Sequence, residues 1–554
     1  MHPVLTTAEL VELVCEKLNE PDPRPRFVGT SASEGTLASL AVTCRAFREP
    51  ALDALWKMQR GIQNVIKCLP SHLWELREDA LNMDADQEFE WTGENPHRRP
   101  LHIIGTIQPG DWAVPLSYSR RIKTLFLCSP LPAEMHVLDT TLFEAIASTL
   151  PSPLFCPNLR SLHWGMDDEE DLLPYLNLFL GPRIEFVNFN IGTPTFNDIP
   201  IPSGLALQSL KRLHAPCNFK LAGSAAEDAV LLCRPACELI KQLDQIEVLS
   251  LPNVNREALE RLSRFPSLKA LNLAYARPEV LGPASDGGTH PSPGFPALRS
   301  VRLEAALPDF ILEFLQLQSS DCGIADLYVE FAGGIPQGRN VSVVSDAINA
   351  RLSSTSLKRL SLSMTVHGRP RPSIHDLGGD INDLIPLFSF HALVKVHLSL
   401  PVVAHMDDAM IADVARSWPK LTELELADPD HNICLRPIPR QPPRMTLKAL
   451  VAFAAHCRDL ESLTLYIDAA ADIPLASDGE FPKAQLALRT LDVGMSPIGK
   501  EFESVAKFLG RLFPRLEKIE PDVRVKIGWD KSVAGRTTEA RWKSIQRLLQ
   551  EGSE

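Results

Sequence analysis

The stretch Leu421-Thr422-Glu423-Leu424-Glu425-Leu426 decides the fold of this chain, because its pattern returns throughout the sequence. Aliphatic residues occupy the first, fourth and sixth positions, and polar residues fill the positions between them. Apolar and polar residues alternate in the second half, and this period of two predicts a short strand with one buried face. The stretch that precedes it, Asp407–Trp418, has helical periodicity. The local pattern therefore predicts a unit of one helix followed by one strand.

Fourteen copies of this pattern occur between residues 122 and 519. They begin at Ile122, Leu159, Ile184, Leu210, Ile246, Leu268, Leu298, Ile324, Leu357, Leu393, Leu421, Leu460, Leu488 and Leu516, with Ile184 and Ile324 starting weaker copies. Their mean spacing is about 30 residues, close to that of leucine-rich repeats. Helical stretches separate several copies, among them Glu257–Phe265 and Thr446–Cys457.

These units resemble leucine-rich repeats, and the resemblance implies an α/β fold: an irregular solenoid with a curved parallel sheet and outer helices. Each repeat would bury its apolar face only against its neighbours. Polar residues at alternate strand positions, such as Arg302, Glu425 and Thr464, would then face the concave side. Either a protein partner or solvent would meet those side chains, and the pattern does not distinguish the two.

The N-terminal sequence predicts three short helices. Thr6-Thr7-Ala8-Glu9 has the form of a capping box that opens the first helix. Behind it one helical stripe follows at spacings of three and four residues, formed by Val11, Val14, Cys15 and Leu18.

The second and third helices follow a loop. Residues 21–35 are rich in Pro, Arg, Ser and Gly, which predicts that loop. A second helix is expected from Thr36, and a third over Ala51–Met58 with Pro50 at its start. Three short helices bury only a small core, so the module would be marginal alone.

Three segments of this module resemble the F-box, especially that of mushroom-forming fungi: Glu9 to Leu18, Leu40 to Phe47, and Pro50 to Trp56. Ala8 stands where the family usually has Pro. The resemblance implies docking on a Skp-type adaptor and, through it, on a cullin of a RING-type ubiquitin ligase. It places that contact on Leu5, Leu10, Val14, Pro50, Leu55 and Trp56. Alternatively, these residues form only the core of a helical cap.

The charge of the chain argues against nucleic acid as a partner. The 554 residues carry 56 Lys and Arg against 69 Asp and Glu, a net charge of −13. Such a chain repels a phosphate backbone unless a local basic face exists. The C-terminal residues 523–554 are the one part with a clear basic excess, of +3.

Cysteine usage and hydropathy predict a cytoplasmic or nuclear protein. The eleven Cys are scattered, odd in number and without a CxxC pair, which favours reduced thiols. Residues 1–14 lack the features of a signal peptide. No window approaches 18 uninterrupted apolar residues, so we expect no membrane span.

The motifs do not predict an enzyme. Gly494 to Lys500 matches the phosphate-binding pattern GxxxxGK, but Glu501 follows where Ser or Thr should bind magnesium. There is no HExxH, and Cys233 and Cys237 have no His partners at zinc spacing. We therefore expect no catalytic residue, cofactor or metal.

Four segments result: an F-box-like module (1–60), a connecting or capping segment (61–119), the repeat solenoid (120–522) and a C-terminal basic helix (523–554). In the last segment a helix is expected over Thr538–Gln550, with Trp542 on its apolar side. The favoured function is substrate recognition for a ubiquitin ligase, with the solenoid binding an unknown protein. The alternative is a repeat scaffold without a ligase.

Overall fold

The structure is a computed structural model, and the chain forms two compact units. Unit 1 comprises Met1–Lys220 and Glu238–Leu251, and unit 2 comprises Leu221–Cys237 and Pro252–Glu554. The structure describes residues 7–19, 32–76, 101–128, 140–165, 170–189, 209–215, 237–243, 245–251, 254–276, 294–305, 308–319, 323–332, 339–365, 380–427, 443–474, 482–494, 496–521 and 533–551.

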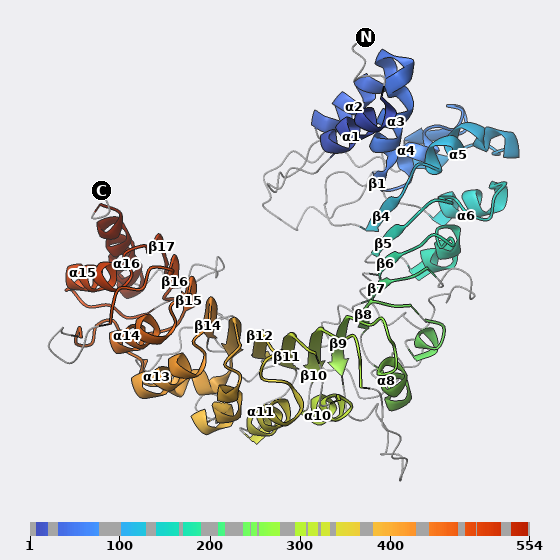
Figure 1. Ribbon diagram of the computed structural model, residues 1–554. Coiled ribbons are helices and arrows are strands. Elements are labelled where there is room, and N and C mark those ends of the chain that lie inside the picture. Colours follow the sequence, from blue (N-terminus) through green and yellow to red (C-terminus); the bar gives the residue numbers. More distant parts are fainter. Residues whose placement is uncertain are drawn as a thin grey trace. The chain divides into compact units, whose positions relative to one another are not determined.

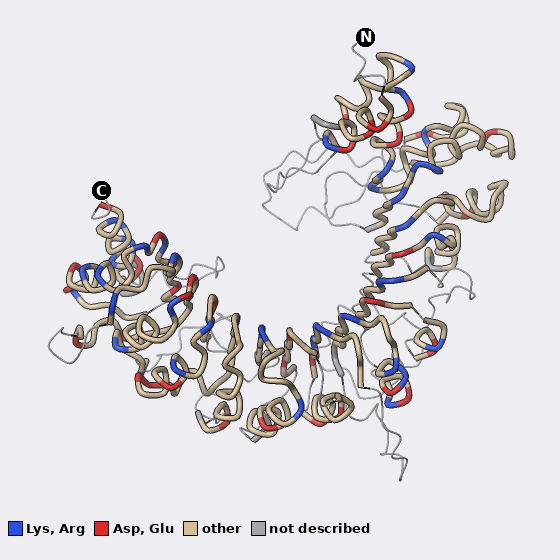
Figure 2. The backbone as a smooth tube through the Cα atoms, in the orientation of Figure 1, with Lys and Arg blue, Asp and Glu red and all other residues tan. Residues whose placement is uncertain are grey.

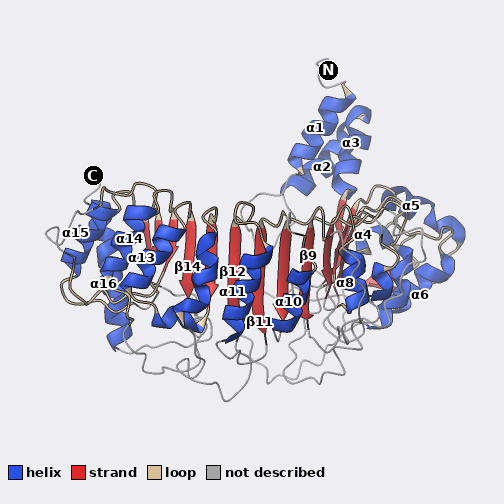
Figure 3. Cartoon of the chain, turned by 60° about the horizontal axis from the view of Figure 1, so that its bottom comes forward, coloured by secondary structure: helices blue, strands red, loops and turns tan. Residues whose placement is uncertain are grey.

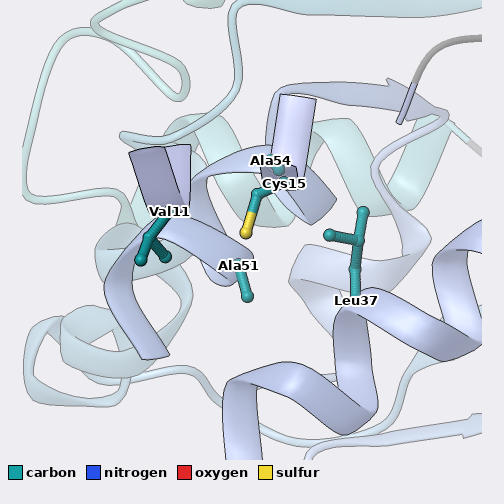
Figure 4. Close-up of a cluster of buried hydrophobic side chains, with 5 residues drawn as sticks. All are labelled: Val11, Cys15, Leu37, Ala51 and Ala54. Carbon is teal, nitrogen blue, oxygen red and sulfur yellow. The ribbon is translucent and has the colours of Figure 1, made fainter. Parts of the chain in front are cut away.

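Unit 1 begins with a helical module of three helices, α1 (Ala8–Leu18), α2 (Ala32–Thr43) and α3 (Arg45–Trp56). Figure 4 shows its small buried core, which consists of Val11, Cys15, Leu37, Ala51 and Ala54. Only two of these side chains are branched aliphatics. A module of this length can bury only such a small apolar core.

Two of the three helices begin earlier than the sequence predicted. Helix α2 begins at Ala32 and not at Thr36, and α3 begins at Arg45, so that Pro50 lies inside it. Pro50 lacks an N–H, so only one intrahelical hydrogen bond, to the Ala46 carbonyl, is lost close to the helix start. Burial of Ala51 and Ala54 against the core compensates that loss.

The predicted capping box at the start of α1 is wrong. The N-cap residue is Thr7, and its side chain makes no capping hydrogen bond. Thr6 lies outside the described residues. The first turn instead begins with backbone hydrogen bonds from Leu10 and Val11 to the Thr7 carbonyl, at 3.1 and 3.2 Å.

Parallel strands follow the module in unit 1 (Figure 1). In sheet order these are β1 (Met58–Arg60), β4 (Thr124–Cys128), β5 (Ser161–Gly165), β6 (Phe186–Phe189), β7 (Arg212–His214) and β8 (Val248–Leu251). Their register places one buried aliphatic residue beside the next: Leu125, Leu162, Val187, Leu213 and Leu249. Adjacent repeats thus share one continuous apolar ridge.

Strand β1 was not predicted, because its buried position holds Gln59 and not an aliphatic residue. Gln59 pairs in register with Leu125 and is 8% exposed. Its amide nitrogen donates to the Leu55 and Met58 carbonyls, and its oxygen accepts from Asn64. Gln59 thus takes the place of Leu in the first strand. Both the nitrogen and the oxygen of its buried amide are hydrogen-bonded, so no polar atom of this side chain is left unsatisfied.

Unit 2 repeats the same architecture. In sheet order its strands are β9 (Ala270–Ala276), β10 (Ser300–Ala305), β11 (Asp326–Ala332), β12 (Arg359–Thr365), β13 (Lys395–Ser399), β14 (Glu423–Ala427), β15 (Ser462–Thr464), β16 (Thr490–Asp492) and β17 (Lys518–Glu520). All fourteen sequence copies of the repeat are therefore confirmed as strands of a parallel sheet among the described residues, five in unit 1 (β4 to β8) and nine in unit 2 (β9 to β17).

Helices pack on one face of the sheet in each unit, and the other face is open (Figures 1 and 3). In unit 1 these are α4 (Gln63–Ile66), η2 (Pro109–Trp112), α5 (Ala113–Ser119), α6 (Thr140–Thr149) and η3 (Glu170–Leu178), beside a small β2–β3 hairpin of Trp74–Leu76 and Leu101–Ile103. In unit 2 they are α8 (Arg256–Leu262), α10 (Pro308–Gln316), α11 (Arg339–Arg351), η5 (Ile381–Ser389), η6 (Pro401–His405), α13 (Asp408–Ser417), α14 (Leu447–His456) and α15 (Phe502–Leu512). The three interrepeat helices expected from the sequence correspond to α8, α13 and α14.

A C-terminal helix, α16 (Val533–Glu551), closes the last repeat and begins five residues before the predicted Thr538. Trp542 is fully buried, and its indole nitrogen donates to the Ser496 carbonyl at 2.9 Å. Gln546 pairs with the edge strand β17: it accepts from the Ile519 amide at 2.8 Å and donates to the Glu517 carbonyl at 3.0 Å. The helix therefore satisfies part of an edge that would otherwise be open to pairing.

The described cysteines are free thiols, as expected, and several are buried. Burial raises the pKa of Cys457 to about 12 and also raises the pKa of Cys156. These thiols act as small apolar residues of the repeat core.

Trp542→Ala should destabilise unit 2 by about 3–5 kcal/mol, because it removes a buried indole and leaves the Ser496 carbonyl without its donor. In this variant, hydrogen exchange relative to the parent should accelerate more in β16 and β17 than in β12. Leu548→Ala on the same helix is the control, because Leu548 is 38% exposed. Equal exchange rates in the Trp542 variant and the parent would contradict the capping role.

Candidate functional site

The first candidate surface is the outer face of α1, formed by Leu10, Leu13 and Val14. These side chains are 41%, 51% and 51% exposed. Their spacing of three and four residues places them on one side of the helix. The opposite side, with Val11 and Cys15, enters the module core. Val14 thus belongs to the exposed side, whereas Val11 and Cys15 of the same predicted helical stripe are buried.

The other predicted adaptor-binding residues lie in different surroundings. Pro50 and Leu55 are half-buried, and Leu55 packs against the module core. Trp56 stacks on Tyr118 of α5, with ring centroids 4.6 Å apart and planes 25° apart. Leu5 lies outside the described residues. Of the six residues, Leu10 and Val14 are therefore the pair that α1 brings together on its surface.

Polar contacts fasten this module to the rest of unit 1. Arg121 forms ion pairs with Glu49 and Asp53 of α3. The Arg121 hydrogen bond and charge lower the pKa of the Glu49 carboxyl. Lys57 binds Glu16 at 3.0 Å, so α1 also contacts the residue that leads into β1. With the Trp56 stack, these contacts hold the module in one orientation on its own unit.

The second candidate surface is the open face of the sheet, which we describe separately for each unit. In unit 1 alternate strand positions place on it Met58, Arg60, Thr124, Phe126, Ser161, His163, Phe186, Asn188, Arg212, His214, Val248 and Ser250. Figure 2 shows Lys and Arg recurring along these strands.

Aromatic and imidazole rings cross the open face of unit 1. Phe126 stacks on His163 with centroids 4.1 Å apart, and His163 meets Phe186 edge-on at 5.1 Å. The guanidinium of Arg212 lies 5.3 Å from the centre of the Phe186 ring. We call these four residues the aromatic stripe. Desolvation by burial lowers the pKa of His163, which favours an uncharged ring in the stripe at neutral pH.

The aromatic stripe was not predicted from the sequence, although the repeat pattern contains a signal for it. Phe126 and His163 occupy the same position of their repeat copies, between two buried apolar residues. Aligning neighbouring copies in register places such residues side by side.

The open face of unit 2 has a different character, because oppositely charged side chains pair across its strands. Arg359 binds Asp326 through two hydrogen bonds of 2.5 and 2.6 Å. Farther along the sheet, Lys395 forms an ion pair with Glu423 at 2.6 Å, and the His397 ring contacts the Glu425 carboxylate at 3.0 Å. Arg302 and Glu425, both predicted to point outward, do lie on this face, and Arg302 forms an ion pair there.

One carboxylate on this face has an unusual environment. Glu304 of β10 lies in register with Glu330 of β11. Burial, and next to it the charge of Glu330, raises the pKa of Glu304 to about 7. Arg302 opposes the shift and binds Glu330 at 3.3 Å.

The loop that matches a phosphate-binding pattern has a structural role. Ser496 accepts a hydrogen bond from the Ile467 amide at 2.9 Å, and its carbonyl accepts from Trp542. Lys500 is exposed. Within the described segments no group of three or more His, Cys, Asp or Glu could hold a metal, and Cys233 lies outside those segments.

Comparisons with known proteins identify no family. No protein-family model matches the chain, and no curated protein matches it either. Among solved structures, the chain is similar to the leucine-rich repeat-containing protein LegL7 from Legionella pneumophila, with 14% identity and a TM-score of 0.26. The match covers 55% of this chain and 82% of LegL7. A likeness at that level carries no argument, so the assignment of a repeat solenoid stands on the register of the strands. In the described part of the chain, no helix is both long and apolar enough to cross a membrane.

Glu304→Gln should stabilise the protein above pH 7 and leave its stability unchanged below pH 4.5. Because the folded-state pKa is raised, the protonated carboxyl stabilises the fold fully below 4.5, and this stabilisation is lost as pH rises through about 7. After discounting for solvent screening, the gain should be about 1–2 kcal/mol, or roughly 1–3 °C in Tm for a unit of this size.

Thermal unfolding measured across this pH range checks the prediction for Glu304. Glu461→Gln, which neutralises an exposed carboxylate of the same unit, is the control. A Tm difference that does not vary with pH would show that folding does not raise the pKa of Glu304.

Proposed function

We propose that this protein is the substrate-recognition subunit of a cullin–RING ubiquitin ligase. Its helical module docks a Skp-type adaptor, and through the adaptor a cullin, while the open face of its repeats binds a target protein. The protein itself carries out no chemistry in this role. The ubiquitin transfer belongs to other subunits of the assembly.

The main support for the proposal is the exposed apolar face of α1 on a module with a very small core. Leu10, Leu13 and Val14 expose 41% or more of their surface, and Val42 on α2 exposes 86%. Covering such residues with a partner stabilises both the complex and a marginal module. Because the same segment resembles the F-box, we propose a Skp-type adaptor as this partner.

The contacts at the base of the module support a receptor role as well. Arg121, Lys57 and Trp56 connect the module to the rest of unit 1. A rigid connection of this kind would hold the adaptor in a fixed orientation relative to the open face of unit 1. Ligase receptors need such an arrangement, because the bound target must face the enzyme that modifies it.

Leu10→Asp and Val14→Asp should each weaken binding of the full chain to a purified Skp-type adaptor by at least about tenfold, because each places a charge in an apolar contact. Biolayer interferometry measures the dissociation constant. Val343→Asp on α11 is the matched control, because Val343 is an apolar helix residue that is 44% exposed.

Circular dichroism of each variant separates loss of contact from loss of fold. If the parent chain and the control do not bind the adaptor, the ligase proposal fails. The remaining function would then be a leucine-rich-repeat scaffold that binds proteins without a ligase. If both Asp variants still bind the adaptor as the parent does, the contact does not lie on α1.

A further inference from the structure

A row of charged residues lies along the N-terminal ends of the strands in unit 1. We call this row the edge ladder: the residues that directly precede the strands, namely Lys57, Lys123, Arg160, Glu185, Lys211 and Glu247. Backbone hydrogen bonds connect successive members, for example from Arg160 to Lys123 at 2.9 Å and from Lys211 to Glu185 at 3.0 Å. The members therefore line up at one height of the sheet.

Two cations of the ladder are neutralised by neighbours. Lys57 binds Glu16 at 3.0 Å, and Arg160 lies 3.6 Å from Glu185. Lys123 lowers the pKa of the Glu16 carboxyl through its charge but forms no ion pair with it. Lys211 likewise has no ion-pair partner within the described segments.

Two further cations stand on the open face itself. Arg60 of β1 and Arg212 of β7 are both exposed, and neither forms an ion pair with a described residue. Arg212 lies over the Phe186 ring instead. Unit 1 thus presents four exposed cations that form no ion pair with a described carboxylate, in a chain whose net charge is −13. On unit 2 the cations of the open face are largely paired with carboxylates.

The four cations lie on both sides of the three rings of the aromatic stripe. Arg60 lies on β1 and Lys123 directly precedes β4, the rings of Phe126, His163 and Phe186 follow on β4, β5 and β6, and the other two cations lie directly before and at the start of β7. Strands lie about 4.8 Å apart, so the two cationic sides are separated by roughly 14–19 Å. An extended peptide covers that distance in about four to six residues.

We infer that the open face of unit 1 binds an acidic peptide segment that carries an apolar side chain between two groups of carboxylates. The apolar side chain lies over the aromatic stripe, and the carboxylates meet Lys123 and Arg60 on one side and Lys211 and Arg212 on the other. This inference rests on the proposed function and gives the chemistry of the target that the repeats recognise.

A peptide fits this face better than a nucleic acid. Glu185 and Glu247 lie on either side of Lys211 in the edge ladder, so a continuous phosphate backbone would pass over carboxylates. The overall charge of −13 also repels a polyanion at long range. A peptide places its carboxylates at separate positions and can leave the acidic members of the ladder uncovered.

Fluorescence anisotropy with the full chain and a labelled peptide of sequence EDAFADE tests the inference. This peptide should bind, and binding should weaken with added salt, since screening acts over about 8–10 Å. The variants Lys211→Glu and Arg212→Glu should each weaken binding about tenfold, because an attraction becomes a repulsion. Lys358→Glu, an exposed cation before β12 of unit 2, is the matched control and should leave affinity unchanged.

Three other probes separate the outcomes. The isosteric peptide QNAFANQ and the ring-free peptide EDAGADE should both bind at least tenfold more weakly than EDAFADE. Equal binding of QNAFANQ, or tighter binding of a single-stranded oligonucleotide, would overturn the acidic-peptide inference. Since adaptor binding is measured separately, capture of the adaptor without binding of EDAFADE would sink this inference alone.

Discussion

The structure depends on one constraint, which is that neighbouring strands keep their aliphatic residues in register. Leu424 lies between Val396 and Leu463, and all three are buried. A slip of one residue would turn each of these side chains to the open face, because strand side chains alternate with a period of two. A single repeat buries little by itself, so the ridge shared with its neighbours stabilises it.

Because the buried aliphatic residues stabilise the repeats, the residues of the open face can differ from one repeat to the next. Side chains there add little to the core, so their chemistry can follow the partner. In unit 1 they form the aromatic stripe, beside cations that have no ion-pair partner among the described residues, and in unit 2 they form ion pairs such as Arg359–Asp326. Exposed ion pairs contribute little to stability, whereas uncompensated cations beside aromatic rings are available to a ligand.

Register also explains how much the sequence predicted. The strands of the parallel sheet that carry Leu, Ile or Val at the buried positions were all found from the pattern, and β1 was missed because Gln59 takes that position. Pro50 misled the prediction of α3, since packing of Ala51 and Ala54 outweighs one lost hydrogen bond. The exposure of Val14 and the stacking of Trp56 on Tyr118 depend on tertiary contacts that periodicity does not contain.

The central claim is that a small helical module and a repeat surface bind different proteins. Hydrogen–deuterium exchange of the full chain with a purified Skp-type adaptor tests it most directly. The account predicts slower exchange in α1 (Ala8–Leu18) and the other helices of the module, and unchanged exchange in β4 to β7. Protection in those strands with none in α1 would contradict it, because the adaptor would then occupy the open face.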